Sequence, residues 1–321
     1  MKTNKIIIIV LVALFISTIP VLAQENTKDK SDFPVLASPY FGQKPPGKKA
    51  EIFAPGIISR SDYHEHSSPF FTKDGKEVYW SAQCMYEGES NQRIFFMKLE
   101  NGKWTPPEIL NFTKKFHGGG PVFSLDEKRL FFYSCRPKPF KERFDNLHIW
   151  YVEKTNTGWT EPVKMSQPVN SEKSESNPTF TPEGTMYFDS KRKGGKGKAD
   201  IYRSQFINGK FKKPQNLGEA INTEDTEYAP CIAPDESYLV FSRYTENPKG
   251  VQLYISFHRS DGSWTKAVKM SEKNKLFGKA RFPGLSPNGK YLFFCAYANR
   301  DVEIYWVDTK IIEEFKPEEL K

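Results

Sequence analysis

One pattern of apolar and polar positions recurs five times along the chain, and each copy predicts a pair of β-strands. An apolar run after a proline meets a polar turn such as Lys73-Asp74-Gly75-Lys76, and an aromatic-rich run such as Val78-Tyr79-Trp80 follows. Asp-Gly and Asn-Gly turns supply the positive φ that short hairpins need, and the flanking residues suit a buried pleated surface. The repeated prolines are Pro69, Pro121, Pro178, Pro230 and Pro283.

A third apolar signal follows every hairpin, and a fourth follows in four of the five copies. The third signal is Ile94-Phe95, Ile149-Trp150, Ile201-Tyr202, Leu253-Tyr254 and Ile304-Tyr305, and a fourth follows in four copies, as in Gly102 to Leu110. The prolines are 52, 57, 52 and 53 residues apart, a spacing typical of propeller blades. A four-stranded sheet cannot bury both faces alone, so the units must stack, and radial stacking gives an all-β propeller. Five blades are favoured, and six would require residues 33–60 to hide a degenerate blade.

The two ends of the chain predict how the ring closes. Glu51 to Ser59 resembles a fourth strand with no first three before it. The last copy instead runs into Asp308 to Phe315, which has an N-cap residue and helical spacing of apolar positions. We therefore expect the N-terminal strand to complete the last blade. The rival interpretation makes Phe315 to Leu320 the outer strand.

The first residues have the pattern of a targeting signal. Lys2 and Lys5 give a basic start, Ile6 to Ile16 is apolar, and Ala23 suits cleavage. We expect a signal peptide at residues 1–23, a disordered and then extended strap at 24–50, and one propeller domain with a short C-terminal helix at 51–321. A retained membrane anchor is the alternative, although no other stretch could span a membrane. The mature chain is expected to be periplasmic or secreted.

The third copy carries a resemblance to a known repeat. Ser176 to Tyr202 contains Asn-Pro-x-Phe-x-Pro-x-Gly, Tyr-Phe-x-Ser and Asp-Ile-Tyr, and these pieces resemble the TolB-like, WD-repeat-like β-propeller repeat of exported bacterial proteins. The resemblance extends from Glu51 to Val307. It implies the fold and not an activity, because propellers host unrelated chemistries. The larger grouping is six-bladed, so five copies are a departure from it.

The net charge indicates the kind of partner, and the positions of the cysteines indicate the state of their thiols. The formal net charge is +8 and the pI is about 9.0, although the lysines are scattered as on a solvated rim. An exported basic protein more readily meets anionic glycans, acidic peptides or proteins than nucleic acid, so no nucleic-acid partner is predicted. The mean hydropathy of -0.62 excludes a membrane-embedded protein. The four cysteines, each in a different copy, are expected to be buried free thiols: Cys84, Cys135, Cys231 and Cys295.

Topology indicates where a ligand would bind. The loops that precede the first strand of each blade and those that follow the second strand emerge on one face, which we call the mouth. The tight Asp-Gly turns lie on the opposite face. The predicted ligand-binding residues all come from mouth loops: His64, Glu65, His66, His117, Arg136, Glu175, Arg192, Glu227, Arg243 and Arg281.

Some of these residues suggest chemistry, each with a plainer alternative. His64, His66 and His117 are a candidate set of divalent-metal ligands, or else ordinary loop histidines. Glu175 and Glu227 are a candidate acid–base pair for a glycoside, or else structural carboxylates. There is no complete catalytic set and no cofactor motif. The sequence therefore predicts a binding module for a protein, peptide or glycan, with a lyase or glycosidase acting on acidic polysaccharide as the alternative.

Overall fold

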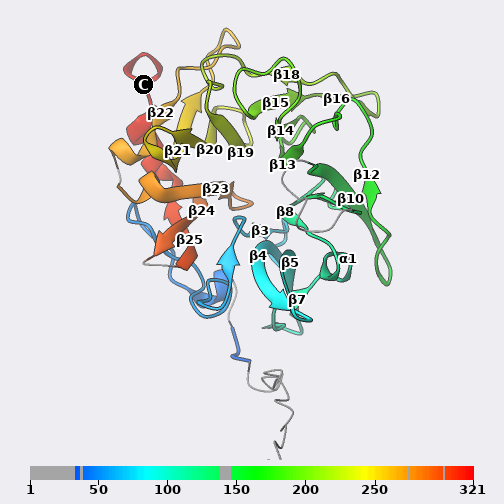
Figure 1. Ribbon diagram of the computed structural model, residues 1–321. Helices are drawn as coiled ribbons and strands as arrows, with labels where there is room; N and C mark the ends of the chain where they lie inside the picture. Colours follow the sequence, from blue (N-terminus) through cyan, green and yellow to red (C-terminus); the bar gives the residue numbers. More distant parts are fainter. Residues whose placement is uncertain (1–32, 37–38, 138–145, 274, 299–300) are drawn as a thin grey trace, which may run out of the picture. The chain divides into compact units, whose positions relative to one another are not determined.

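Five antiparallel sheets, one for each copy of the repeat, form a ring in the computed structural model (Figure 1). The structure describes residues 33–36, 39–137, 146–273, 275–298 and 301–321. The chain divides into residues 1–34 and 35–321, and the second unit holds every described strand. The predicted signal peptide and the predicted disordered stretch up to residue 32 lie outside the described residues. The predicted five-bladed β-propeller is confirmed.

The blades follow the order of the chain. Blade 1 contains β2 (His64–Glu65), β3 (Phe70–Phe71), β4 (Glu77–Tyr86), β5 (Glu89–Glu100), β6 (Lys103–Trp104) and β7 (Glu108–Ile109). Blade 2, preceded by α1 (Asn111–Lys114), contains β8 (Gly119–Phe123), β9 (Arg129–Ser134), β10 (His148–Thr155), β11 (Gly158–Trp159) and β12 (Val163–Lys164). Blade 3 contains β13 (Glu175–Phe180), β14 (Met186–Ser190), β15 (Asp200–Ser204), β16 (Phe206–Ile207), β17 (Lys210–Phe211) and β18 (Gln215–Asn216).

The last two blades include most of the short 3-10 helices. Blade 4 contains β19 (Thr226–Ile232), β20 (Tyr238–Glu246), β21 (Lys249–Phe257) and β22 (Val268–Lys269). Blade 5 contains β23 (Ala280–Leu285), β24 (Tyr291–Ala298), β25 (Asp301–Asp308) and β1 (Glu51–Ile52). The 3-10 helices are η2 (Tyr40–Gly42), η4 (Met270–Glu272), η5 (Lys275–Lys279), η6 (Thr309–Phe315) and η7 (Glu318–Leu320).

The N-terminal strand closes the ring, as predicted. In the pairing of β1 with β25, Glu51 lies opposite Trp306 and Ile52 opposite Tyr305. The rival interpretation of the C-terminus is wrong, because residues 315–320 form no strand and contain the end of η6 and all of η7. The segment after β25 is a 3-10 helix whose N-cap, Asp308, accepts a hydrogen bond from the backbone N–H of Lys310.

The hydrophobic core is divided among the interfaces between neighbouring blades. Buried clusters join blades 1 and 2, blades 2 and 3, blades 3 and 4, and blades 4 and 5. The interface between blades 5 and 1 is built from aromatic rings, in which the buried Phe53 lies 5.0 Å from Phe293 and 5.1 Å from Trp306. Tyr40 of η2 adds its ring 5.3 Å from Phe71 and 5.5 Å from Trp306. Each sheet therefore covers its neighbour's apolar face.

The repeated prolines mark an irregularity in the innermost strand. In blades 2 to 5 the strand register shifts just before the proline, which is the signature of a β-bulge. The residue before each of these prolines has a positive φ of 48° to 57°: Gly120, Asn177, Ala229 and Phe282. These bulges turn backbone and side chains toward the axis of the ring.

Candidate functional site

Three of the arginines predicted at the mouth form hydrogen bonds within the fold. Arg136, Arg192 and Arg243, which follow the second strands of blades 2, 3 and 4, each donate to a backbone carbonyl in the loop that precedes the same blade. Those carbonyls belong to Phe112, Val169 and Ile221, at 2.8, 2.5 and 2.8 Å. Each guanidinium also lies over an aromatic ring of its blade, at 5.0, 5.0 and 4.0 Å. Burial lowers the pKa of Arg136 to about 10. These clamp arginines tie two mouth loops together.

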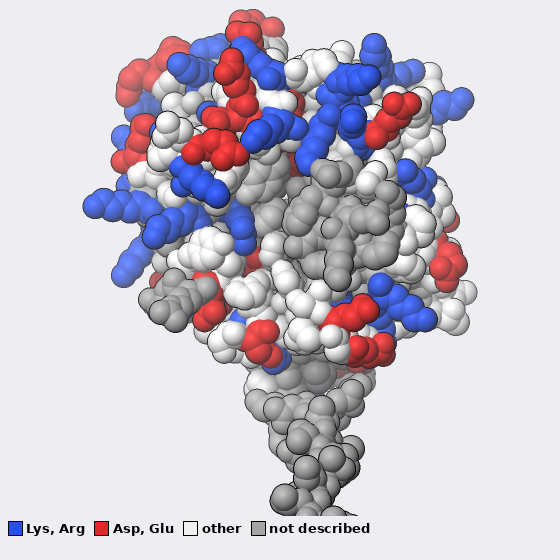
Figure 2. All heavy atoms as spheres, in the orientation of Figure 1, with Lys and Arg blue, Asp and Glu red and all other residues white. Residues whose placement is uncertain are grey.

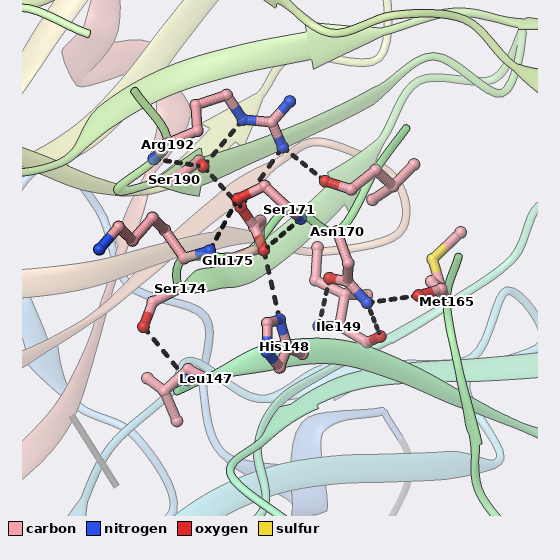
Figure 3. A network of polar contacts seen from close by, with 12 residues as sticks. Leu147, His148, Ile149, Met165, Asn170, Ser171, Ser174, Glu175, Ser190 and Arg192 are labelled. Atoms are coloured by element: carbon pink, nitrogen blue, oxygen red, sulfur yellow. Dashed lines mark hydrogen bonds and ion pairs between the residues drawn. The ribbon is translucent and has the colours of Figure 1, made fainter. Parts of the chain in front are cut away.

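Glu175 lies at the centre of the polar network drawn in Figure 3. Its carboxylate accepts hydrogen bonds from the backbone N–H of Ser171 at 2.9 Å and from the hydroxyls of Ser171 and Ser190 at 2.5 and 2.8 Å. His148 Nδ1 lies 3.4 Å from one oxygen and Arg192 Nη2 lies 3.5 Å from the other. Burial raises the pKa of Glu175, but these hydrogen bonds outweigh it and hold the pKa below its ordinary value.

Glu227 repeats the arrangement in blade 4. Its carboxylate accepts from the backbone N–H and hydroxyl of Thr223 at 3.1 and 2.6 Å, and from Arg243 Nε at 2.7 Å. Both Glu175 and Glu227 are completely buried. The structure therefore surrounds each glutamate with donors of its own blade and does not bring the two carboxylates together as a facing pair.

Glu65 occupies the same register position in blade 1 without an arginine. It lies opposite Ala82, as Glu175 lies opposite Ser190. Its Oε1 accepts from the backbone N–H of Arg60 at 3.2 Å, whereas its buried Oε2 has no partner among the described residues. Burial raises the pKa of Glu65 to about 8. This carboxyl is therefore protonated at neutral pH.

The three histidines predicted at the mouth differ in their surroundings. His64 is exposed, His66 is half-buried with its ring 5.9 Å from that of Phe282, and His117 is buried with Nε2 3.2 Å from Gln92 Oε1. Within the described ranges, no group of three His, Cys, Asp or Glu side chains could hold a metal ion. The described structure therefore gives no support to a metal site made by these three histidines, which stays a prediction. The four cysteines are buried and none of them forms a disulfide, as predicted.

Residues from four blades meet on the axis, and we call them the axial cluster: Tyr133, Asp189, Tyr228 and Arg281. Arg281 alone was predicted. Its guanidinium lies 5.4 Å from the ring of Phe282 and 5.5 Å from that of Tyr297, and its buried Nε has no hydrogen-bond partner among the described residues. The ring of Tyr228 lies 5.7 Å from that of Phe282.

Asp189 is the acidic member of the axial cluster, and only neutral groups bond to it. Its carboxylate accepts from the hydroxyl of Ser176 at 2.6 Å, the amide of Asn177 at 2.9 Å and the backbone N–H of Ala229 at 3.0 Å. Burial raises the pKa of Asp189 to about 6, against the effect of these hydrogen bonds. No cation within hydrogen-bonding distance offsets its charge in the described part of the chain.

Tyr133 faces the same space. Its hydroxyl accepts from Gln92 Nε2 at 2.9 Å, and Gly119 leaves room for its ring, because a Cβ there would lie 2.4 Å from Cζ of Tyr133. Burial raises the pKa of Tyr133 to about 12; Asp189 raises that pKa further and Arg281 lowers it. These mutual effects show that groups from blades 2, 3 and 5 share one electrostatic environment.

A signal for this cluster was present in the repeat. Register places five residues, one in the second strand of each blade, at equivalent positions: Ser81, Tyr133, Asp189, Ser242 and Cys295. Serine or cysteine occupies three of the positions, and Ser242 Oγ accepts from the bulged Phe282 N–H of the next blade at 3.0 Å. Tyr133 and Asp189 depart from this pattern, so comparison of the copies would have pointed to them.

Toward the tight turns, the axis widens into a cavity of about 280 Å³. Its walls include all five repeated prolines, and the bulged residues Asn177, Ala229 and Phe282 also line it. This lining is largely apolar. The axis therefore has a polar layer, made by the axial cluster, and an apolar vestibule on the face of the tight turns.

Lysines surround the mouth on three blades. Figure 2 shows many Lys and Arg, with Asp and Glu among them, over the part of the molecule where Figure 1 places blades 3, 4 and 5. The exposed members with no ion pair to a described residue are Lys193, Lys249, Lys273, Lys275 and Lys279. Two others join neighbouring loops, since Lys196 pairs with Glu219 at 2.6 Å and Lys198 with Glu246 at 2.7 Å.

The fold and the site define a five-bladed β-propeller with a basic mouth, and comparison with known proteins agrees on the fold. No protein family and no curated protein matches the sequence. Among solved structures, TolB from Acinetobacter baumannii is 18% identical with a TM-score of 0.47, and the match covers 74% of this chain and 53% of TolB. The chain thus spans about half the length of that protein.

Two enzymes are also similar in structure. The catalytic domain of an α-L-arabinofuranosidase from Coprinopsis cinerea is 11% identical with a TM-score of 0.50, covering 82% of this chain and 97% of that domain. An oligogalacturonate lyase solved with manganese is 12% identical with a TM-score of 0.41, covering 81% and 68% of the two chains. At 11% identity the likeness to the α-L-arabinofuranosidase domain shows the fold alone. Among the described residues no helix is long and apolar enough to cross a membrane.

Proposed function

We propose that this chain is an exported binding module whose mouth recognises an anionic ligand, best matched by an acidic glycan. The observation that carries the proposal is the group of exposed lysines on the mouth loops of blades 3 to 5 that form no ion pair with a described residue. Unpaired cations on converging loops raise the local concentration of anions. The basic start, apolar run and small cleavage residue of residues 1–23 support export.

Two further features support a carbohydrate and a binding role. Tyr297 exposes 45% of its surface beside Arg281, and a flat ring next to a cation suits the apolar face of an acidic sugar. The carboxylate oxygens of Glu175 and Glu227 accept hydrogen bonds from groups of their own blades. This use of the two carboxylates favours a binding protein over an enzyme that uses them as acid and base.

Calorimetric titration with oligogalacturonate tests the proposal. Replacing Lys193, Lys275 and Lys279 together by Gln should weaken binding roughly tenfold at low salt, and rising salt should shrink the difference. The matched control replaces the exposed Lys103, Lys210 and Lys213 of outer strands and loops, which should bind normally. An equal loss in both triple variants, or equal binding of neutral dextran, would contradict the proposal. Shortening of the oligogalacturonate during the titration would favour the enzyme alternative.

A further inference from the structure

The axial cluster has the donors that a carboxylate group needs. Arg281 presents its side chain at the axis, half-buried between Phe282 and Tyr297, with the Nε donor unused among the described residues. A buried guanidinium N–H without a hydrogen bond costs free energy, because it has lost its contact with water. An anionic acceptor that bonds to this N–H would offset that cost. Tyr228 on the neighbouring blade and Tyr133 across the axis add phenol groups.

We propose that Arg281, Tyr228 and Tyr133 bind one carboxylate group of the ligand at the axis, and that Asp189 weakens this binding when it is ionised. The inference rests on the proposed function and deepens it, because it names the charged group that the ligand presents and the residue that regulates its binding. The lysines of the mouth attract a polyanion, whereas the axial cluster recognises a single group.

The charge of the cluster selects a monoanion. An arginine side chain binds a planar carboxylate through two parallel N–H donors. Asp189 lies in the same electrostatic environment and is bonded only to neutral groups, so a doubly charged phosphate would meet a second negative charge there. A uronic acid, with one carboxylate on a sugar ring, fits both the cluster and the exposed ring of Tyr297.

The protonation of Asp189 sets the pH dependence. Its pKa of about 6 means that the carboxyl is neutral in mildly acidic solution and ionised above that range. The other titratable groups facing it remain neutral across this change, since burial raises the pKa of the phenols of Tyr133 and Tyr228 and of the thiol of Cys295.

Two histidines lie near the axis, and their effect on binding has to be separated from that of Asp189. His66 packs against Phe282, and His117 lies beside Gln92, which bonds to Tyr133. A protonated imidazole would also strengthen anion binding in acid. The variants His66→Gln and His117→Gln therefore serve as controls for the pH profile.

Titration with sodium glucuronate, whose carboxyl is ionised throughout the pH range used, tests the site. Arg281→Gln should abolish measurable binding, and Tyr228→Phe should weaken it severalfold. Arg129→Gln, which removes an exposed arginine paired with Glu153, is the control and should bind as the unchanged protein does. The melting temperature of each variant is measured alongside. Unchanged glucuronate binding by a folded Arg281→Gln variant would overturn the proposal.

The pH profile tests the role of Asp189. Glucuronate affinity of the unchanged protein should fall roughly tenfold between about pH 5 and pH 7.5, as expected for one new charge at close range. Asp189→Asn should bind tightly at both pH values, and the histidine variants should keep the fall. A flat profile in the unchanged protein, or a profile flattened only by His66→Gln or His117→Gln, would overturn it.

The two proposals fail in different ways. Loss of the lysines should weaken oligogalacturonate binding and leave glucuronate binding nearly unchanged, because a single charge gains little from distant cations. If oligogalacturonate binds and Arg281→Gln leaves glucuronate and oligogalacturonate affinity unchanged, the axial site is refuted and the basic mouth stands. If neither compound binds the unchanged protein, both proposals are refuted.

Discussion

Three glutamates share one register position at the mouth, and their surroundings give them different chemistry. Glu175 and Glu227 each meet an arginine of their own blade. Among the described residues Glu65 accepts only from the backbone N–H of Arg60, and burial raises its pKa to about 8. The same side chain is therefore a structural carboxylate whose pKa is held low in blade 3 and a neutral acid in blade 1, whereas in blade 4 burial raises the pKa of Glu227 against the effect of its bonds to Thr223 and Arg243.

Glu65→Gln should change how stability depends on pH. A carboxyl whose pKa is raised in the folded state contributes stability that is fully present below about pH 4.5 and is lost as pH rises through about 8. The free energy of unfolding of the unchanged protein should therefore fall across this window relative to Glu65→Gln, at up to about 1.4 kcal/mol per pH unit. Urea unfolding at several pH values measures the difference. A constant difference between pH 6 and pH 8 would contradict the shifted pKa.

Arg243→Ala should be strongly destabilising, because it leaves Glu227 buried without its cation and Ile221 without a donor. The expected loss is about 3 to 5 kcal/mol in urea unfolding. Arg129→Ala is the matched control, since its ion pair with Glu153 is about half exposed and should be worth about 0 to 1 kcal/mol. Equal losses in the two variants would show that the clamp does not act as described.

The roles of single residues were the hardest part to predict from the sequence. Arg192 and Arg243 were interpreted as ligand contacts because their loops reach the mouth. Their hydrogen bonds run back to Val169 and Ile221, which depends on loop conformation that no local pattern encodes. Asp189 was overlooked because it sits inside a strand that reads as core.

At the scale of elements, the innermost strands were predicted more accurately than their bulges and the outer strands. The proline spacing correctly located every innermost strand, because hairpin turns and apolar runs are local signals. The bulge before the proline was not predicted, since a positive φ at residues such as Ala229 and Phe282 follows from packing at the axis. The outer strands are shorter than their apolar signals suggested, as in β11 and β12.

The segment that follows β1 provides a test of the closing interface. Phe53 is fully buried among the rings of Phe293, Trp306 and Tyr40. Phe53→Ala should lower the free energy of unfolding by about 3 to 5 kcal/mol, through lost burial and the cavity left behind. The control Phe206→Ala, at a ring with 43% of its surface exposed, should cost far less. Similar losses would place the closing interface outside the cooperative core.

At the scale of the whole molecule, the repeat favoured five blades, and the likeness of residues 51–59 to a fourth strand predicted the closing strand. Four interfaces are built from the same kinds of residue, which is why the pattern of one copy predicts the next. The fifth depends on Tyr40 and Phe53, which lie outside the repeat, so sequence periodicity gave no account of it. The topology predicted from the repeat located the candidate ligand site on one face of the ring, but it did not identify the side chains that form the site.

The pairing of β1 with β25 also constrains the order of folding. Residues 51–52 leave the ribosome long before their partners at residues 305–306 exist. Blades 1 to 4 can assemble as synthesis proceeds, whereas blade 5 stays one strand short until its early partner returns to it. The nascent chain must therefore keep residues 51–52 available until the end of translation, and a premature stop before β25 would leave them without a strand to pair with.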